Sequence, residues 1–228
     1  MFVEHINGIN FRISYKLKLK IAMKKRTILQ IVLALVIIAL AVWLYIMIVT
    51  PIRFEKQVNH RKAAVIERIK DIRSAERGYK QLYNEYTGTF DELIRFVLND
   101  SLTFERTFGS LDDSAAVAQN LVRVEQFKMA AIDTVFGSKV LTPEDVRQLR
   151  YIPYGDGAQY ILDATVLVTE SKVSVPVFEC KAPYKDFLFD LNHQELVNYI
   201  DTEKALNKYP GVKVGSLEVA TNDAGNWE

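Results

Sequence analysis

The longest run of apolar residues in the chain extends from Ile28 to Val49 and contains no charged residue. Only Gln30 within it is strongly polar, so the run lacks the polar face that a helix on a soluble core shows. As a helix rising about 1.5 Å per residue, these ~22 residues reach about 33 Å, enough for a hydrocarbon core of about 30 Å. A single segment can cross lipid only as a helix, because lipid offers no partners to free backbone groups. We therefore predict a transmembrane helix over residues 28–50.

Basic residues before this run predict its role and its direction. The stretch Met23–Arg26 (MKKR) resembles the charged region of a signal anchor, and Met23 could serve as a start of the protein as well as Met1. The run is longer than the ~7–15 apolar residues of a cleaved signal peptide, and no small-x-small cleavage site follows it. Positive charge is denser on the N-terminal side, which favours a cytoplasmic N-terminus. We expect an uncleaved, single-pass signal anchor in a bacterial inner membrane, with residues 1–27 in the cytoplasm and the C-terminal domain in the periplasm.

A second pattern, an apolar stripe at helical spacing, covers residues 52–86. Its members recur in steps of three and four, with charged residues between them. They are Val58, Val65, Ile69, Ile72, Ala75, Tyr79, Leu82 and Tyr86. Some of them stand seven apart, so a coiled-coil seam is one interpretation, although Arg68 occupies a position where a second seam residue is needed. We favour the other interpretation, in which the stripe packs against the chain's own sheet. Because proline lacks a backbone N–H, we expect Pro51 to kink or restart the helix.

Shorter elements are predicted between residues 87 and 150. Thr89 is expected to cap a short helix, with Glu92 as its capping-box partner. The buried face of that helix is predicted to be Leu93, Ile94, Phe96 and Val97. Residues 102–108 alternate like a strand, and residues 112–136 are typical of one or two helices. Another helix begins after Thr142, with proline in its first position and acidic residues in its first turn.

After Arg150 the chain becomes rich in Val, Ile, Tyr and Phe, which favours strands. The expected strands cover 151–154, 159–169, 172–180, 187–191 and 212–219, with a helix over 194–208 capped by Asn192. Connections this short require antiparallel pairing, because a parallel crossover needs about a dozen residues. The prediction is an α+β fold in which an N-terminal transmembrane helix continues into an amphipathic helix, followed by helices and a small antiparallel sheet. Its parts are the cytoplasmic segment 1–27, the span 28–50, juxtamembrane amphipathic helices over 51–98 and an α+β extracytoplasmic domain over 99–228.

Charge and cysteine content narrow the possible partners. The chain has 29 Lys and Arg against 28 Asp and Glu, so its net charge of +1 gives no bias toward nucleic acid. Its one cysteine, Cys180, excludes an intrachain disulfide framework and a zinc site built on several cysteines.

Few residues suggest chemistry. The three histidines, His5, His60 and His193, have no partner at a spacing typical of a metal site or a catalytic triad, and we interpret them as surface residues. Phosphate-loop, dinucleotide-binding, zinc-protease, hydrolase and EF-hand motifs are all missing from the sequence. The adjacent carboxylates Asp91–Glu92 and Asp112–Asp113 stand at predicted helix starts, where the helix dipole favours them. Tyr79, Tyr83, Tyr86 and Phe90 could form an adhesive face, but core packing is favoured by their spacing. We predict no catalytic, cofactor-binding or metal-binding residue.

The organisation of the chain resembles that of type IV pilins and pseudopilins. The matching residues are Ile28–Val49, the stretch IERIKDIRSAERGYKQLYNEYTGTFDEL at 66–93 and the strands of 151–191. The resemblance implies an apolar N-terminal helix that runs on into an amphipathic half, which packs against an antiparallel sheet. The chain differs at the processing motif, because MKKRTILQIVL lacks the glycine and the glutamate that pilins carry there.

Two hypotheses of function follow, and we favour the first. In the first, the protein is a non-catalytic structural or interaction component of the envelope. A pilin-like protein is one form of this hypothesis. Its partners are then the lipid bilayer and envelope proteins, or further copies of itself bound through the juxtamembrane helix. In the second, the protein is a membrane-tethered enzyme or small-ligand-binding domain. A pocket with convergent polar groups and a strongly shifted titratable residue would favour that hypothesis. A domain in the cytoplasm, with inverted topology, is a third alternative.

Overall fold

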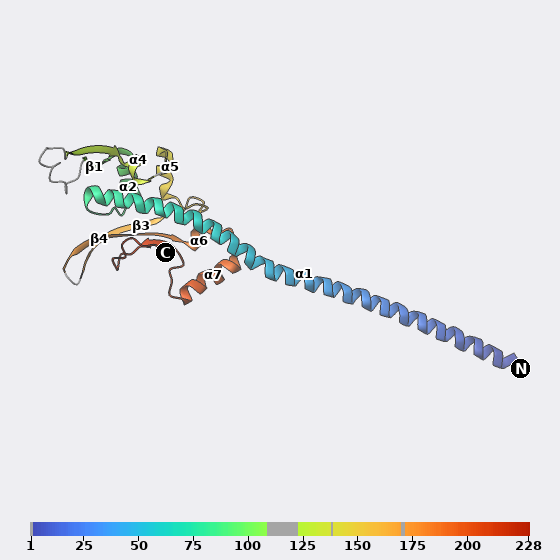
Figure 1. Cartoon of the computed structure of the whole chain (residues 1–228). Coiled ribbons are helices and arrows are strands. Elements are labelled where there is room, and N and C mark those ends of the chain that lie inside the picture. The colour runs from blue at the N-terminus through green and yellow to red at the C-terminus, as the bar shows by residue number, and fades with distance from the viewer. Residues whose placement is uncertain (1, 109–122, 138, 170–171) are drawn as a thin grey trace. The chain divides into compact units, whose positions relative to one another are not determined.

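The computed structural model describes residues 2–108, 123–137, 139–169 and 172–228 (Figure 1). The chain divides into two compact units, which meet in sequence at Arg53 and Phe54. The first unit is helical, and the second contains all the described strands. The fold is α+β, as the sequence predicts. The described elements are α1 (Phe2–Tyr83), α2 (Phe90–Asn99), β1 (Ser101–Phe108), β2 (Arg123–Ala130), α4 (Ala131–Val135), α5 (Pro143–Arg147), η1 (Gln148–Arg150), β3 (Ile161–Val168), β4 (Ser174–Pro183), α6 (Tyr184–Phe187), α7 (His193–Ala205) and β5 (Gly211–Gly215).

Helix α1 is continuous through Pro51, so the predicted restart of the helix at this residue is wrong. Proline removes one N–H from the helical hydrogen-bond ladder, but the turns on either side keep theirs. The hydroxyl of Thr50 also donates to the carbonyl oxygen of Ile46 at 2.7 Å, which adds a bond next to the gap. One lost hydrogen bond is therefore tolerated within a long helix.

The second part of α1 is the central helix of the C-terminal unit. The stripe is buried in the same core as Phe178 of β4 and Val214 of β5, as expected if it packs against the chain's own sheet. Its buried members are Val58, Val65, Ile69, Ile72 and Ala75. In Figure 1 this part of α1 runs between α2 with the β1–β2 hairpin on one side and the strands β3 and β4 on the other. The stripe ends earlier than predicted, because α1 stops at Tyr83 and Leu82 is 39% exposed.

Helix α2 begins at the predicted place but without the predicted capping box. Thr89 is the N-cap residue, yet its side chain makes no capping hydrogen bond. The carboxylate of Glu92 instead accepts a hydrogen bond from the Thr87 hydroxyl at 2.8 Å, which takes it away from the Thr89 backbone. The buried face consists of Phe90, Leu93, Phe96 and Val97, whereas Ile94 is only partly buried.

The prediction of helices over 112–136 is wrong for residues 123–130 and confirmed for residues 131–135, and residues 112–122 lie outside the described part of the chain. Residues 123–130 form β2, which pairs antiparallel with the correctly predicted strand β1. In this register Leu102 and Phe104 lie opposite Met129 and Phe127, on one face of the hairpin. Pairing with β1 thus overrides the helical tendency of the local residues Glu125–Lys128, and only the short helix α4 remains.

The next helix, α5, has the start that the sequence predicts. The Thr142 hydroxyl accepts a hydrogen bond from the Asp145 N–H, and the Asp145 carboxylate accepts one from the Thr142 N–H at 2.9 Å. Pro143 occupies the first turn, where its missing N–H costs nothing.

The main sheet has the strand order β3-β4-β5, and both pairs are antiparallel as predicted. Two predicted strands are wrong. Residues 151–154 contribute only an isolated bridge between Tyr151 and Gln159. Residues 187–191 are not a strand either, because Tyr184, Phe187 and Leu188 are buried at helical spacing and form α6 with the turn after it.

The last helix and strand are shorter than predicted. In α7 the Asn192 side chain caps the helix by accepting from the Glu195 N–H at 3.1 Å, as predicted, and the helix ends at Ala205. Strand β5 ends at Gly215, whose φ of 73° is left-handed. A Cβ at Gly215 would also overlap the carbonyl oxygen of Phe178, so glycine is required where the chain turns away from the sheet.

Candidate functional site

The apolar segment of α1 is the first functional feature. Among the described residues, the helical segment Lys25–Tyr83 is the one helix long and apolar enough to cross a membrane. Its apolar side chains over 28–48 are about half exposed or more in the isolated chain. Such a helix near the N-terminus fits a single-pass membrane protein.

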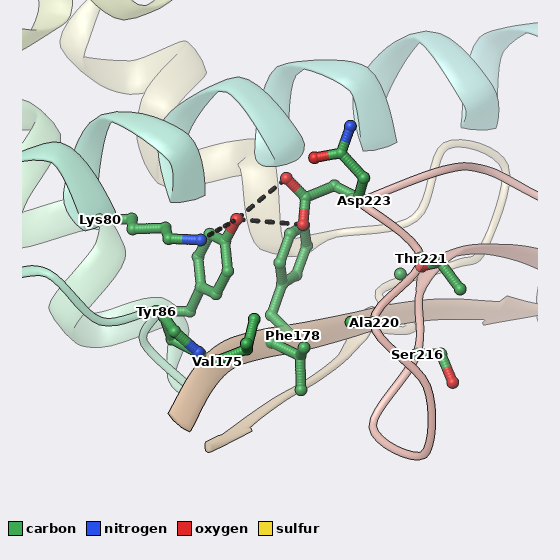
Figure 2. Close-up of a pocket in the computed structure, with 12 residues that line it drawn as sticks. Lys80, Tyr86, Val175, Phe178, Ser216, Ala220, Thr221 and Asp223 are labelled. Carbon is green, nitrogen blue, oxygen red and sulfur yellow. Dashed lines mark hydrogen bonds between the residues drawn. The ribbon is translucent and has the colours of Figure 1, made fainter. Parts of the chain in front are cut away.

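The second feature is a pocket in the C-terminal unit, with a volume of about 180 Å³ (Figure 2). Three parts of the chain build it: the end of α1 with the turn after it, one half of β4, and the loop that follows β5. The lining residues are Lys80, Tyr86, Val175, Pro176, Val177, Phe178, Gly215, Ser216, Ala220, Thr221, Asn222 and Asp223. The wall from β4 is apolar, while the other two walls carry polar and charged groups.

Polar groups converge on the hydroxyl of Tyr86 at one side of the pocket. This hydroxyl donates to the Asp223 carboxylate, with distances of 2.9 and 3.0 Å to its two oxygens. The Nζ of Lys80 donates to the same hydroxyl at 3.4 Å and lies 4.5 Å from the centre of the Tyr86 ring. Figure 2 shows Lys80 and Asp223 approaching the hydroxyl from α1 and from the C-terminal loop.

The loop that carries Asp223 is fixed to α1 by two arginines. Arg77 Nε donates to the Asp223 carboxylate at 3.0 Å, and Arg73 Nη1 donates to the Asp223 backbone oxygen at 3.2 Å. Asn222 and Asp223 both have left-handed backbones, with φ of 53° and 58°. Successive left-handed non-glycine residues are energetically unfavourable, so the arginine contacts must help to hold this loop conformation.

The environment of the pocket shifts the titration of Tyr86. Burial, the hydrogen bond to Asp223 and the charge of Asp223 raise the pKa of the Tyr86 hydroxyl well above its usual value. The Tyr86 hydroxyl is therefore neutral at physiological pH, and it donates its hydrogen bond to Asp223.

A buried carboxylate, Glu76, lies on α1 one turn before Lys80. Its side chain is fully buried, and its Oε2 accepts a hydrogen bond from the Thr87 N–H at 3.1 Å. Its Oε1 has no hydrogen-bond partner within the described residues. Burial, followed by the weaker effect of the Asp223 charge, raises the pKa of Glu76 to about 8 despite the opposing hydrogen bond from Thr87. Glu76 does not line the pocket, and its hydrogen bond with Thr87 joins α1 to the turn before α2.

A wider groove of about 710 Å³ lies on another face of α1. Its polar centre is Lys139, whose Nζ lies 2.7 Å from the Asp71 carboxylate and 3.2 Å from that of Glu67. Because the cation is already neutralised by two carboxylates, this groove offers less unsatisfied charge than the pocket at Lys80.

The structure separates the residues that the sequence analysis considered for chemistry. His60 and His193 are exposed, and His5 lies where side chains are not described. Asp91 pairs with Arg150, and Glu92 bonds Thr87, so these adjacent carboxylates have different partners. Across the ranges that the structure describes, no group of three His, Cys, Asp or Glu side chains is placed to hold a metal ion.

The aromatic residues divide between core and surface. Tyr86 and Phe90 are buried, Tyr79 packs against the core, and Tyr83 is 45% exposed. The centres of the Tyr79 and Tyr83 rings lie 4.5 Å apart. Three of these four residues therefore belong to the core, and Tyr86 also reaches the pocket.

Sequence reasoning did not identify Lys80 or Asp223. The only available signal was the cluster of tyrosines near the end of the amphipathic helix, which points to Tyr86 without its partners. Asp223 is 137 residues from Tyr86, and no local pattern relates the two. Searches against protein-family models, curated proteins and solved structures find no match to this chain.

Proposed function

We propose that this protein is a membrane-anchored, non-catalytic component of a bacterial cell envelope, acting through protein contacts of its C-terminal domain. The observation that carries the proposal is that α1 contains both the candidate membrane span and the central helix of the domain core. This is the arrangement expected from the resemblance to pilins and pseudopilins, in which one helix supplies the anchor and the core. We infer a periplasmic domain from the density of basic residues before the span.

The chain between span and domain supports a function at the membrane surface. Only residues 50–53 separate the apolar run from Phe54, the first buried residue of the core. Five residue steps reach at most about 18 Å when fully extended and about 7.5 Å as a helix. A domain held this closely would meet its partners at the membrane surface, and it could not search far into the periplasm.

Exposed apolar residues provide candidate contact surfaces. Phe127 on β2 is 42% exposed, and the edge strand β3 carries Val166 and Val168 with 54% and 70% exposure. An edge strand offers unpaired backbone groups to another chain, and nearby valines would add apolar contact. These surfaces favour protein contact, with envelope proteins or with a second copy of this chain.

Topology is tested by cysteine labelling of the full chain in intact cells, with an impermeant thiol reagent after permeabilisation of the outer membrane only. Lys208→Cys introduces an exposed thiol, and we expect it to react. Cys180 is fully buried, so the native thiol should react only after denaturation and serves as an internal control. Lys18→Cys, before the span, should stay protected until the inner membrane is lysed. The reverse pattern would place the domain in the cytoplasm and refute the envelope proposal.

Contact is tested by placing a photo-cross-linking amino acid at Val168 or Phe127 in the full chain in cells. The matched control is position Lys204, which is exposed on α7. We expect a defined cross-linked product, either with another envelope protein or with a second copy, at one of the apolar positions and not at 204. Equal cross-linking at all three positions would contradict a specific contact surface.

A further inference from the structure

The pocket beside Lys80 has features that the proposed contact function does not use. We infer that it is a binding site for one carboxylate group attached to a short apolar stem. This inference concerns a different surface from the apolar contact residues, and it does not depend on the proposed function.

The first argument is the state of the Lys80 ammonium group. It is half-buried at the pocket wall, and within the described residues no carboxylate forms an ion pair with it. Its partners are the Tyr86 hydroxyl at 3.4 Å and the face of the Tyr86 ring. A lysine has three N–H donors, so at least two remain for an anionic ligand.

The second argument is that Asp223 does not compete for this position. Its carboxylate accepts from the Tyr86 hydroxyl through both oxygens, and from Arg77 Nε at 3.0 Å. Asp223 thus has hydrogen-bond partners for both carboxylate oxygens, and its ion pair is with Arg77 and not with Lys80. The electrostatic preference of the pocket is for an anion.

The third argument comes from the shape and composition of the walls. Val175, Pro176 and Phe178 form an apolar wall from β4. A volume of about 180 Å³ is far larger than the ~10–15 Å³ that a single water molecule needs. The pocket therefore fits a stem of a few carbon atoms whose charged end reaches Lys80.

The fourth argument separates a carboxylate from a phosphate. Asp223 and Lys80 both contact the Tyr86 hydroxyl, so a second negative charge on the ligand would lie near the Asp223 carboxylate. One lysine balances a monoanion, whereas a phosphate dianion would need a further unpaired cation. Arg77 cannot supply that charge, because it already pairs with Asp223. A monovalent carboxylate is the better match.

Such a carboxylate can come from a small free acid or from the C-terminal residue of a polypeptide. The test uses equilibrium dialysis of radiolabelled probes against the purified full chain in detergent. 3-Methylbutanoate represents the free acid, and N-acetyl-leucine represents the chain terminus. N-acetyl-leucinamide has the same stem without the charge, and inorganic phosphate is the dianion for comparison. The probe that binds more tightly identifies the source.

We expect saturable binding of at least one carboxylate and binding at least tenfold weaker for the amide and for phosphate. Lys80→Met should weaken carboxylate binding about 10- to 100-fold, since a charge-assisted hydrogen bond is lost. Lys70→Met, an exposed lysine on the same helix, should bind like the wild type. Lys80→Arg should retain binding. Tyr86→Phe should weaken binding, because Asp223 then loses the hydroxyl that occupies its oxygens and can compete for the Lys80 ammonium.

A second variant keeps the test decisive if Lys80→Met does not fold. Ala220 is exposed on the loop at the pocket wall, so Ala220→Trp fills the pocket and leaves Lys80 in place. Carboxylate binding should then disappear, and the signal that remains measures partition into detergent. The inference is overturned if no carboxylate binds saturably, or if the amide or phosphate binds as tightly as the carboxylate. It is also overturned if Lys80→Met and Lys70→Met bind the carboxylate equally, or if Ala220→Trp binds it like the wild type.

Discussion

The buried carboxylate of Glu76 leads to a prediction about pH. Its side chain is fully buried, one oxygen bonds the Thr87 N–H, and the other has no partner in the described structure. The fold therefore favours the protonated form and raises the pKa of Glu76 to about 8, against an ordinary value of 4.5. Asp223 contributes to the shift, and it is the charged group that acts most strongly on Glu76.

The sign follows from proton binding in the two states. Below pH 4.5 the Glu76 carboxyl is protonated in both the folded and the unfolded chain. Burial of the neutral group then costs no deprotonation, and the fold has its full stability with respect to Glu76. Between pH 4.5 and about 8 only the folded chain holds it, so stability falls as the pH rises. Each pKa unit corresponds to about 1.4 kcal/mol, so the total loss is at most about 5 kcal/mol.

The perturbation is Glu76→Gln, which keeps an acceptor for the Thr87 N–H and removes the titration. We expect the free energy of unfolding to match the wild type within about 1 kcal/mol at pH 5 and to exceed it by several kcal/mol at pH 8.5. The assay is urea unfolding of the full chain in detergent, with Trp43 replaced by Phe so that Trp227 reports on the domain.

Comparison with a matched variant isolates the effect of burial. Glu85→Gln makes the same chemical change at an exposed position, and it should leave the pH dependence of the wild type unchanged. Other titratable groups cancel in the difference between Glu76→Gln and the wild type. If that difference is the same at pH 5 and pH 8.5, the argument from burial is refuted.

Three further predictions concern the stability of the fold, each measured by thermal unfolding of the full chain in detergent. Gly215→Ala should destabilise the fold by about 2 kcal/mol or more, roughly twice the cost of Gly137→Ala. Both glycines have left-handed backbones, but only at Gly215 would the new Cβ overlap a backbone oxygen. Equal losses of stability in the two variants would contradict this. Ile72→Ala should cost about 2–5 kcal/mol, and Leu82→Ala, at a 39% exposed position of the same helix, less than about 1 kcal/mol; a reversed order would show that the stripe is not the core. Thr142→Ala should cost about 1 kcal/mol through loss of the capping box, with Thr142→Ser close to the wild type; an unaffected melting temperature in Thr142→Ala would count against the cap.

Features with a strong periodic signal could be predicted from the sequence. The candidate membrane span is recognisable from its length and apolar composition alone, and Ile69 and Ile72 recur at a helical spacing that a buried face requires. The Thr142 cap is encoded within four residues. Antiparallel pairing of β3 and β4 follows from their short connection.

The errors arise where distant residues decide the local structure. Residues 123–130 contain good helix formers, and only the pairing with β1 makes them a strand. Glu92 satisfies the rule for a capping box, but Thr87 offers it a closer partner. The pocket is the extreme case, because Lys80, Val175 and Asp223 are brought together only by tertiary packing.

The contacts between α1 and the C-terminal loop join parts of the chain that are synthesised far apart in time. Arg73 pairs with Glu228, and Arg77 pairs with Asp223, across 155 and 146 residues of chain. At a synthesis rate of about 5–20 residues per second, the α1 stripe is made roughly 7–30 s before these partners. Throughout this interval the apolar face of α1 lacks part of its final surroundings, and contacts of such high sequence separation form slowly. The α1 stripe is therefore exposed to misassembly until residues 223–228 have been synthesised.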